Sequence, residues 1–161
     1  MVDSRAFAQQ RKNSVRLQGF TLIELLVVLV IMAILLSIAV PGYQTYVDRT
    51  RRADAQAALV LLSGAMERFY TENNSYLGAA NGGGNTGAPG IFNTTVPLDG
   101  GTANYNLTIN AATATTFTLR ATPVGVQDGD GLLEYTNAGV RRWDKNDDGD
   151  TGDAGEDNWS R

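Results

Sequence analysis

The sequence predicts an α+β fold in which a long N-terminal spine helix crosses a membrane with its first half and packs its second half on a small antiparallel β-sheet. Three observations predict it. An apolar run is long enough to cross a bilayer, a helical stripe of apolar side chains follows, and segments of alternating apolar and polar residues come after a glycine-rich loop. A length of 161 residues suits one modest domain and an anchor.

The apolar run covers residues 20–40 and reads F-T-L-I-E-L-L-V-V-L-V-I-M-A-I-L-L-S-I-A-V. Its 21 residues match the roughly 20 that a helix needs to cross a bilayer. Fifteen of them are Leu, Ile, Val or Phe, worth about −4 to −9 kcal/mol of insertion free energy in total, whereas one carboxylate, Glu24, costs at most roughly 3.5 kcal/mol. We therefore predict a transmembrane helix over residues 20–47 and a globular head over residues 48–161.

Pro41 and Gly42 follow the apolar run. Proline removes the backbone hydrogen bond to the carbonyl of Ser37 and crowds that turn, so a kink or local melting of the helix is expected.

A second helical segment follows, with an apolar stripe at steps of four and three residues that suits the face on which a head packs. The helix is expected to end near Glu72, because Asn73-Asn74-Ser75 are turn-forming residues. The stripe consists of Ala55, Leu59, Leu62, Met66 and Phe69, and the charged residues Arg49, Arg51, Arg52, Asp54, Glu67 and Arg68 are expected to occupy much of the remaining surface.

Residues 78–101 are rich in Gly, Asn, Thr and Ala and predict a long surface loop, either a solvated linker or a face that contacts neighbours. Alternation then predicts three or four antiparallel strands within residues 104–140. The inward positions of these strands are Tyr105, Leu107 and Ile109, then Phe117, Leu119 and Ala121, with a shorter candidate at 132–135.

The segment 143–159 is an acidic loop bracketed by Trp143 and Trp159, which are expected to pack at its base. Ten of the seventeen acidic residues lie between 128 and 157, and such a crowd of charges repels itself unless it is neutralised. The alternatives are a calcium site and a solvated acidic loop that binds nothing.

Calcium is suggested because the loop opens with the D-x-[DN]-x-[DN]-G pattern of a calcium-binding loop. Position twelve of an EF-hand would be Gly155 rather than a bidentate Glu, so the loop is not an EF-hand. Asp128 or Asp130 could reach in from the preceding turn. The candidate calcium ligands are Asp144, Asn146, Asp148, Asp150, Asp153, Glu156 and Asp157.

The chain contains neither cysteine nor histidine. A disulfide, a Ser-His-Asp triad and a Cys-His pair are therefore excluded, and the commonest zinc ligands are missing. The acidic residues cluster in a glycine-rich tail rather than in a plausible pocket. We therefore expect no enzymatic activity.

Residues 19–24, G-F-T-L-I-E, resemble the class III leader junction of type IV pilins and pseudopilins, and the resemblance continues through Pro41. It implies that a prepilin peptidase removes residues 1–19 by cutting between Gly19 and Phe20, and methylates Phe20 as the new N-terminus. An ordinary signal peptide differs, because it is cut after its apolar core.

The head segments E-R-F-Y-T-E-N-N-S-Y and F-T-L-R-A-T-P resemble type IVa minor pilins of the PilE type. The resemblance implies a structural subunit that polymerises through its N-terminal helix into a pilus, where Glu24 faces the amino group of a neighbouring subunit's Phe20. It also implies Pro41 as an assembly residue. A major pilin and a type II secretion pseudopilin are alternatives, and a role in twitching motility, cell adhesion or DNA uptake stays open.

The resemblance further implies an inner-membrane location before assembly, an extracellular pilus afterwards, and an inner-membrane assembly platform as a partner. The positively charged residues of the leader keep the N-terminus cytoplasmic. The leader is longer than the half dozen or so residues usual in type IVa pilins. Pilins of this type commonly close their C-terminal region with a disulfide, whereas pseudopilins of type II secretion bind calcium in an acidic C-terminal loop like this one.

A tip adhesin or a DNA-binding module is the alternative of another class. Loss of Asp3, Arg5, Arg11, Lys12 and Arg16 with the leader changes the net charge from −4 to −7. Nucleic acid is therefore not expected as a partner, because nonspecific phosphate binding needs a basic face. The basic clusters of the mature chain are residues 49–52 and 141–142.

Overall fold

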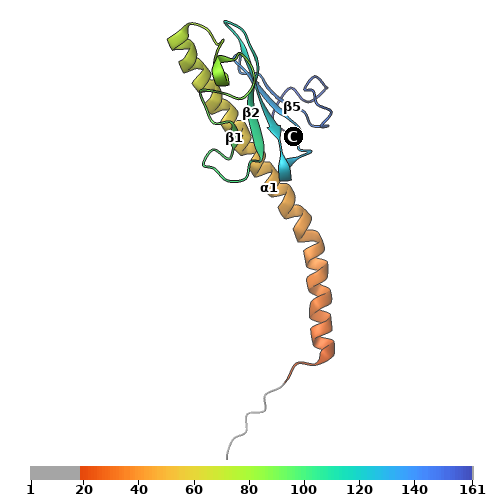
Figure 1. The fold of residues 1–161 in the computed structure, drawn as a ribbon. Coiled ribbons are helices and arrows are strands. Elements are labelled where there is room, and N and C mark those ends of the chain that lie inside the picture. Colours follow the sequence, from red (N-terminus) through yellow and green to blue (C-terminus); the bar gives the residue numbers. More distant parts are fainter. Residues whose placement is uncertain (1–18, 161) are drawn as a thin grey trace, which may run out of the picture. The chain divides into compact units, whose positions relative to one another are not determined.

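The computed structural model describes residues 19–160 (Figure 1). Contacts divide the chain into two compact units, Met1–Pro41 and Gly42–Arg161. This boundary lies a few residues before the predicted one at 47/48. One helix, α1 (Leu22–Asn73, 52 residues), supplies the described residues of the first unit from Leu22 onward and the N-terminal part of the second.

In the first unit, every described side chain is exposed. Thr21 stands just before α1, and its Oγ1 accepts the backbone N–H of Glu24 at 3.2 Å. Thr21 therefore caps the helix N-terminus, and T-L-I-E is the sequence of a capping box. Within residues 19–160, α1 is the one helix long and apolar enough to cross a membrane. The apolar surface of residues 20–40 needs a cover that its own unit does not supply.

Helix α1 continues through Pro41 and Gly42, so the predicted local melting is wrong. A proline in a helix lacks only its own N–H, and the hydrogen bonds of the turns on either side can persist. The predicted C-terminus of the helix is confirmed. Asn74, the residue after the last helical one, has φ 54°, a left-handed conformation that commonly ends helices.

The second unit contains a five-stranded antiparallel sheet whose strands are adjacent in chain order. Register pairs Leu107 with Ala121, Leu119 with Tyr135 and Leu133 with Trp143. The strands are β1 (Thr95–Val96), β2 (Tyr105–Ala112), β3 (Phe117–Pro123), β4 (Leu133–Thr136) and β5 (Arg141–Trp143).

The core lies between the C-terminal part of α1 and one face of this sheet, which Figure 1 shows side by side. The predicted helical stripe is confirmed: four of its members are fully buried and Phe69 packs partly buried at the edge. The α+β prediction is confirmed with it. The expected number of strands was too low, because β1 and β5 are two and three residues long and show no alternation.

The loop predicted at 78–101 contains β1 and a short 3-10 helix, η1 (Asn81–Gly83). It is fastened to the sheet, since Gly87 and Ile109 exchange two backbone hydrogen bonds of 2.9 and 2.8 Å. Backbone bonding of this kind makes the segment an extension of the sheet rather than a solvated linker.

A tight turn precedes β4 and runs from η2 (Gly125–Gln127) to Gly131. Gly131 has φ 77°, and a Cβ added there would lie 1.6 Å from the carbonyl oxygen of Asp144. The Asp144 backbone is itself bonded to Leu132, with N–H to O at 3.0 Å. The turn and the start of the acidic loop thus fit together only because residue 131 has no side chain.

Gly131→Ala is expected to lower the free energy of unfolding by about 3 kcal/mol or more, because the Asp144 carbonyl must move and a left-handed alanine is strained. Gly129→Ala is the matched control: its φ is 84° but its Cβ would meet nothing closer than 3.9 Å. It is expected to lose only about 1–2 kcal/mol. Urea denaturation of the detergent-solubilised chain measures both, and equal losses would contradict the steric account.

Candidate functional site

The predicted processing and assembly residues lie at the start of the described chain. Gly19 and Phe20 precede α1 and are not helical, and Phe20 is 87% exposed. A peptidase needs an accessible peptide bond outside regular secondary structure, so the exposed, non-helical Gly19–Phe20 bond is compatible with the predicted cleavage. Glu24 is exposed in the first turn of α1. The rest of the predicted leader, residues 1–18, lies outside the described residues.

The second unit has a buried ion pair that the sequence analysis missed. Arg52 on α1 donates from Nε to Asp130 Oδ2 at 2.7 Å and from Nη2 to Asp130 Oδ1, a bidentate pair. Arg52 is buried, contrary to the expectation that it occupies the solvated face. It stands three residues before Ala55, in line with the apolar stripe. A charge in that position needs a buried partner, and this spacing was the available signal.

Two aromatic residues complete the Arg52 pair. The Tyr105 hydroxyl donates to Asp130 Oδ2 at 2.5 Å, and the Trp143 indole N–H donates to the Asp130 carbonyl at 2.8 Å. The Arg52 guanidinium carbon lies 3.8 Å from the centroid of the Trp143 ring. The helix, the turn before β4, and strands β2 and β5 therefore meet at one charged pair. We call Arg52, Tyr105, Asp130 and Trp143 the junction cluster.

Burial and the Asp130 carboxylate set the proton affinities in the junction cluster. Burial raises the pKa of Tyr105, and its hydrogen bond to Asp130 raises it further, because both disfavour the phenolate. For Arg52, burial acts to lower the pKa, but the bond to Asp130 and its charge outweigh burial and raise it. The junction thus holds a neutral phenol beside the Arg52–Asp130 ion pair.

Gln127 adds a second attachment of the turn before β4 to α1. Its amide nitrogen donates to the carbonyl of Asp48 at 3.2 Å, and its side chain is buried. The turn before β4 is therefore attached to α1 at two points, Asp48 and Arg52.

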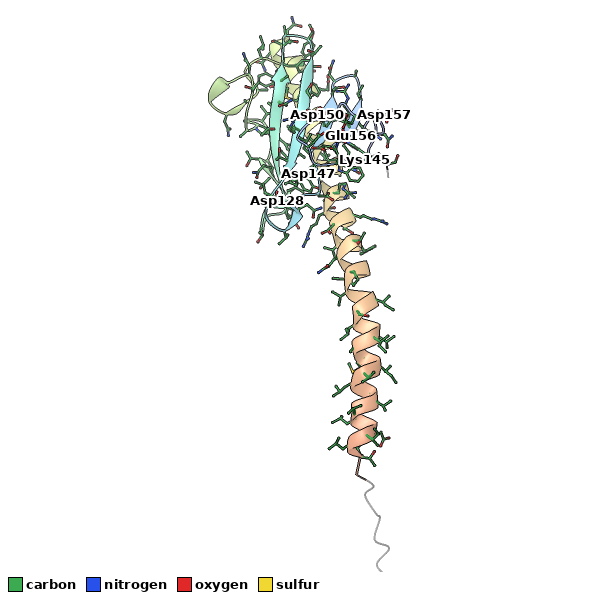
Figure 2. The ribbon with its side chains drawn as sticks, turned by 90° about the vertical axis from the view of Figure 1, so that its right-hand side faces the viewer. Asp128, Lys145, Asp147, Asp150, Glu156 and Asp157 are labelled. Carbon is green, nitrogen blue, oxygen red and sulfur yellow. The ribbon has the colours of Figure 1, made fainter. Side chains whose placement is uncertain are left out.

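The acidic loop begins after β5, and Figure 2 labels several of its charged side chains. Trp143 is buried, and Trp159 packs partly buried against the core, so the expectation that both pack at the base of the loop is confirmed. Trp159 donates its indole N–H to the Arg142 carbonyl at 2.9 Å. Thr151 donates to the buried Glu134 carboxylate on β4 at 2.9 Å, which ties the loop to the sheet.

The structure brings some of the candidate calcium ligands together. The amide nitrogen of Asn146 donates to Asp148 Oδ2 and Asp153 Oδ2, both at 2.9 Å. Buried Asp144 accepts the backbone N–H groups of Asp148 and Gly149 at 3.2 and 3.0 Å.

Three other candidate calcium ligands have hydrogen-bond partners outside the group formed by Asn146, Asp148 and Asp153. Glu156 is buried and accepts the backbone N–H of Lys145 at 2.9 Å, while Asp150 and Asp157 bond to their own neighbours in the chain. Asp130, a possible additional ligand, belongs to the junction cluster. Among residues 19–160, no three acidic side chains converge as a set that could hold a metal ion. The calcium site stays a prediction, without a preformed cage.

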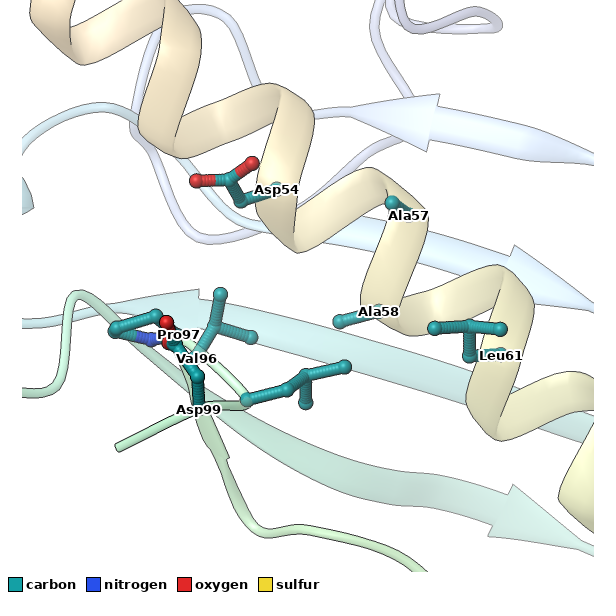
Figure 3. A pocket seen from close by; sticks show the side chains of 8 residues that line it. Asp54, Ala57, Ala58, Leu61, Val96, Pro97 and Asp99 are labelled. Carbon is teal, nitrogen blue, oxygen red and sulfur yellow. The ribbon is translucent and has the colours of Figure 1, made fainter. Parts of the chain in front are cut away.

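A cavity of about 330 Å³ lies between α1 and the chain around β1 (Figure 3). Its wall is largely apolar, with Asp54 and Asp99 as its charged side chains. None of the residues predicted for processing, assembly or metal binding lines it. The other lining residues are Ala57, Ala58, Leu61, Val96, Pro97 and Leu98.

A family model described as "Type IV minor pilin ComP, DNA uptake sequence receptor" matches residues 41–131, more than half of the chain. The chain belongs to this family. A second model, the prokaryotic N-terminal methylation motif, matches residues 16–40. The predicted membership of the type IV pilins and the preference for a minor pilin are thereby confirmed. A pilin of this family is a structural protein, as the absence of a catalytic constellation in the sequence had indicated.

Individual relatives match over shorter stretches. The chain is 38% identical over 66 residues to the type IV major pilin protein PilA of Myxococcus xanthus, covering 41% of this chain and 30% of PilA. It is 34% identical over 65 residues to the type II secretion system core protein G of Pectobacterium carotovorum subsp. carotovorum, covering 40% and 42%. The chain thus spans less than half the length of these curated relatives.

Among solved structures, the chain is similar to the non-core minor pilin PilV of Neisseria meningitidis, with a TM-score of 0.46 and 17% identity. The similarity covers 68% of this chain and 98% of the PilV chain.

Stability is expected to fall above about pH 10, because Tyr105 must keep its proton in the folded state while an unfolded tyrosine releases it near pH 10. The stabilisation from this raised pKa is fully present below about pH 10 and is lost as the pH rises. Tyr105→Phe is expected to cost about 1–3 kcal/mol at pH 7 and to flatten the alkaline fall. Tyr46→Phe is the control, since Tyr46 is 69% exposed. Urea denaturation between pH 7 and 11 measures the free energy of unfolding of each variant. If this free energy falls with pH as steeply in Tyr105→Phe as in the wild type, the account is contradicted.

Calcium is expected to raise the melting temperature, and EDTA to reverse the rise, if oxygen ligands replace the Asn146 amide between Asp148 and Asp153. Asp153→Asn is expected to abolish the calcium response. Asp99→Asn, a matched change outside the loop, is expected to preserve it. A melting temperature that stays constant up to millimolar calcium would contradict the calcium prediction.

Proposed function

We propose that this protein is a structural minor subunit of a type IV pilus, processed at the Gly19–Phe20 bond and assembled through the N-terminal part of α1. The main support is the combination of a methylation-motif match over residues 16–40 with a minor-pilin match over residues 41–131. The structure adds an apolar helix surface over residues 20–40 that is exposed throughout. A membrane covers that surface before assembly, and the helices of neighbouring subunits cover it in the filament.

Glu24 is the residue we expect to set the position of the subunit in the filament. In an apolar helix bundle its carboxylate is costly unless a cation lies beside it, and the N-terminal amine of a neighbouring Phe20 supplies that cation. Desolvation offsets much of the attraction, so the pair contributes more to register than to stability. The cap by Thr21 orders the first turn, so that Glu24 occupies a defined position.

The processing enzyme, the assembly partners and the cellular location of the chain follow from this proposed role. A prepilin peptidase cuts and methylates the chain, an inner-membrane platform receives it, and other pilin subunits are its partners in the filament. Before assembly the chain crosses the inner membrane with its N-terminus in the cytoplasm, and after assembly its head is extracellular. The relatives include a major pilin and a secretion core protein G, and the minor-pilin family match favours the minor subunit over both.

DNA binding is a second candidate function. The matching family is described as a DNA uptake sequence receptor. The sequence analysis disfavoured nucleic acid because of the net negative charge, but that argument concerns nonspecific binding to a uniformly basic face. A local site can still bind a few phosphates.

Glu24→Ala is expected to leave cleavage and membrane insertion intact and to remove the subunit from sheared pili by at least about tenfold. The reason is that the apolar run and the Gly19–Phe20 bond are unchanged while the partner of the neighbouring amine is lost. Quantitative immunoblotting of membrane and pilus fractions measures both steps. Glu72→Ala is the matched control, since Glu72 is an exposed acid on the same helix. If Glu24→Ala is found in pili in wild-type amounts, the assembly proposal is contradicted.

A further inference from the structure

Two tyrosines stand on α1 just after its apolar run, and the described part of the chain covers neither of them. Tyr43 is 70% exposed and Tyr46 is 69% exposed. They are three residues apart, so they lie on the same side of the helix. A tyrosine ring has an apolar body and a polar hydroxyl, and such rings gather where hydrocarbon meets water at a membrane surface.

The charges of the sequence show where this boundary lies along α1. Between Glu24 and Asp48 the sequence contains no charged residue, and the two tyrosines occupy the end of this uncharged segment. Arg49 follows, is exposed, and forms no ion pair within residues 19–160. A free arginine next to the tyrosines is suited to lipid phosphate groups, because its long side chain can reach them.

The spacing along α1 fits the thickness of a bilayer. Tyr43 follows Glu24 by nineteen positions, which is roughly 28 Å of helix at about 1.5 Å per residue. The hydrocarbon core of a bilayer is about 30 Å thick, with a headgroup layer of about 5–7 Å on each side. When Tyr43 lies at one boundary of the core, Tyr46 therefore lies in the headgroup layer and Glu24 lies just inside the other boundary.

We propose that Tyr43 and Tyr46 form an interfacial anchor that binds the phospholipid headgroup layer and fixes the depth of Glu24 in the membrane. The inference rests on the membrane insertion proposed above and names the partner of this part of α1. Glu24 and the anchor act in opposite directions. An ionised carboxylate is favoured in water, so it draws the helix toward the N-terminus, whereas the tyrosine hydroxyls resist entry into hydrocarbon.

The depth of Glu24 has a consequence for assembly. A carboxylate held just inside the hydrocarbon is already poorly solvated, so part of the desolvation cost of its pair with a neighbouring amine is met before the subunits join. The anchor therefore favours the interaction that the assembly proposal assigns to Glu24.

The test measures depth in the membrane with a nitroxide label on a single introduced cysteine, since the chain has no cysteine of its own. The full chain is reconstituted into vesicles of phosphatidylcholine and phosphatidylglycerol with the label at Gln44→Cys, an exposed position between the two tyrosines. Collisions with oxygen, which concentrates in hydrocarbon, and with a water-soluble nickel chelate give the depth of the label. Labels at Leu35→Cys and Arg68→Cys calibrate hydrocarbon and water. The label at Gln44→Cys is expected in the headgroup layer.

Substitution of both tyrosines tests whether they act as an anchor. Tyr43→Ala with Tyr46→Ala is expected to let the Gln44→Cys label sink by roughly 3–5 Å, up to one helical turn, because Glu24 then draws the helix unopposed. Tyr43→Trp with Tyr46→Trp is expected to preserve the depth, since tryptophan also favours the interface. Addition of Glu24→Gln to the alanine pair is expected to restore the depth. Leu61→Ala, at an exposed apolar position of α1 beyond the anchor, is the control and is expected to change nothing.

Three results would overturn the assignment. The first is a Gln44→Cys label that lies in water while both tyrosines are present, and the second is a depth that the alanine pair leaves unchanged. The third is a label shielded from oxygen and nickel chelate alike, which would mean that a second copy of the chain covers the tyrosines. In each case a Leu35→Cys label in hydrocarbon leaves the proposed membrane insertion standing, whereas a Leu35→Cys label in water contradicts that insertion as well.

Discussion

The apolar surface of helix α1 surrounds the helix over residues 20–40 and narrows to one stripe beyond residue 52. The way in which each part of this surface is covered determines the rest of the fold. Over residues 20–40 the apolar side chains face all directions and are exposed. Beyond residue 52 the buried positions form one stripe, and the sheet covers it. In the proposed role, a membrane and then neighbouring helices would provide two successive covers of similar polarity for the first part, so transfer between them would not expose hydrocarbon to water.

The second unit must hold its C-terminal region in place without a disulfide, because the chain has no cysteine. Here the junction cluster joins α1 to the turn before β4 and to strands β2 and β5. The acidic loop is attached next to it, through the close fit of Gly131 to Asp144 and through the Thr151 to Glu134 hydrogen bond. A buried ion pair is costly to break and specific in geometry, so it fixes where the C-terminal region packs. Loss of the pair would expose both the loop and the helix face.

The sequence predicted the helices and strands in which a run or a periodic pattern of apolar residues extends over several positions. The apolar run of residues 20–40, the stripe from Ala55 to Phe69 and strands β2 to β4 were all found in this way. Strands β1 and β5 were missed because pairing with their neighbours, rather than alternation, defines them. Local melting, one of the two outcomes expected at Pro41, does not occur, since α1 continues through that residue. Arg52 and Asp130 are far apart in sequence, and only the fold shows that they pair.

The central claim is that the apolar helix is retained as the N-terminus of the working protein. The intact mass of the chain purified from pili tests this most directly. The account predicts a mass for residues 20–161 that is higher by one methylene unit, with the extra mass on Phe20 after fragmentation. A chain that still carries residues 1–19, or one cut after the apolar run near Val40, would contradict it.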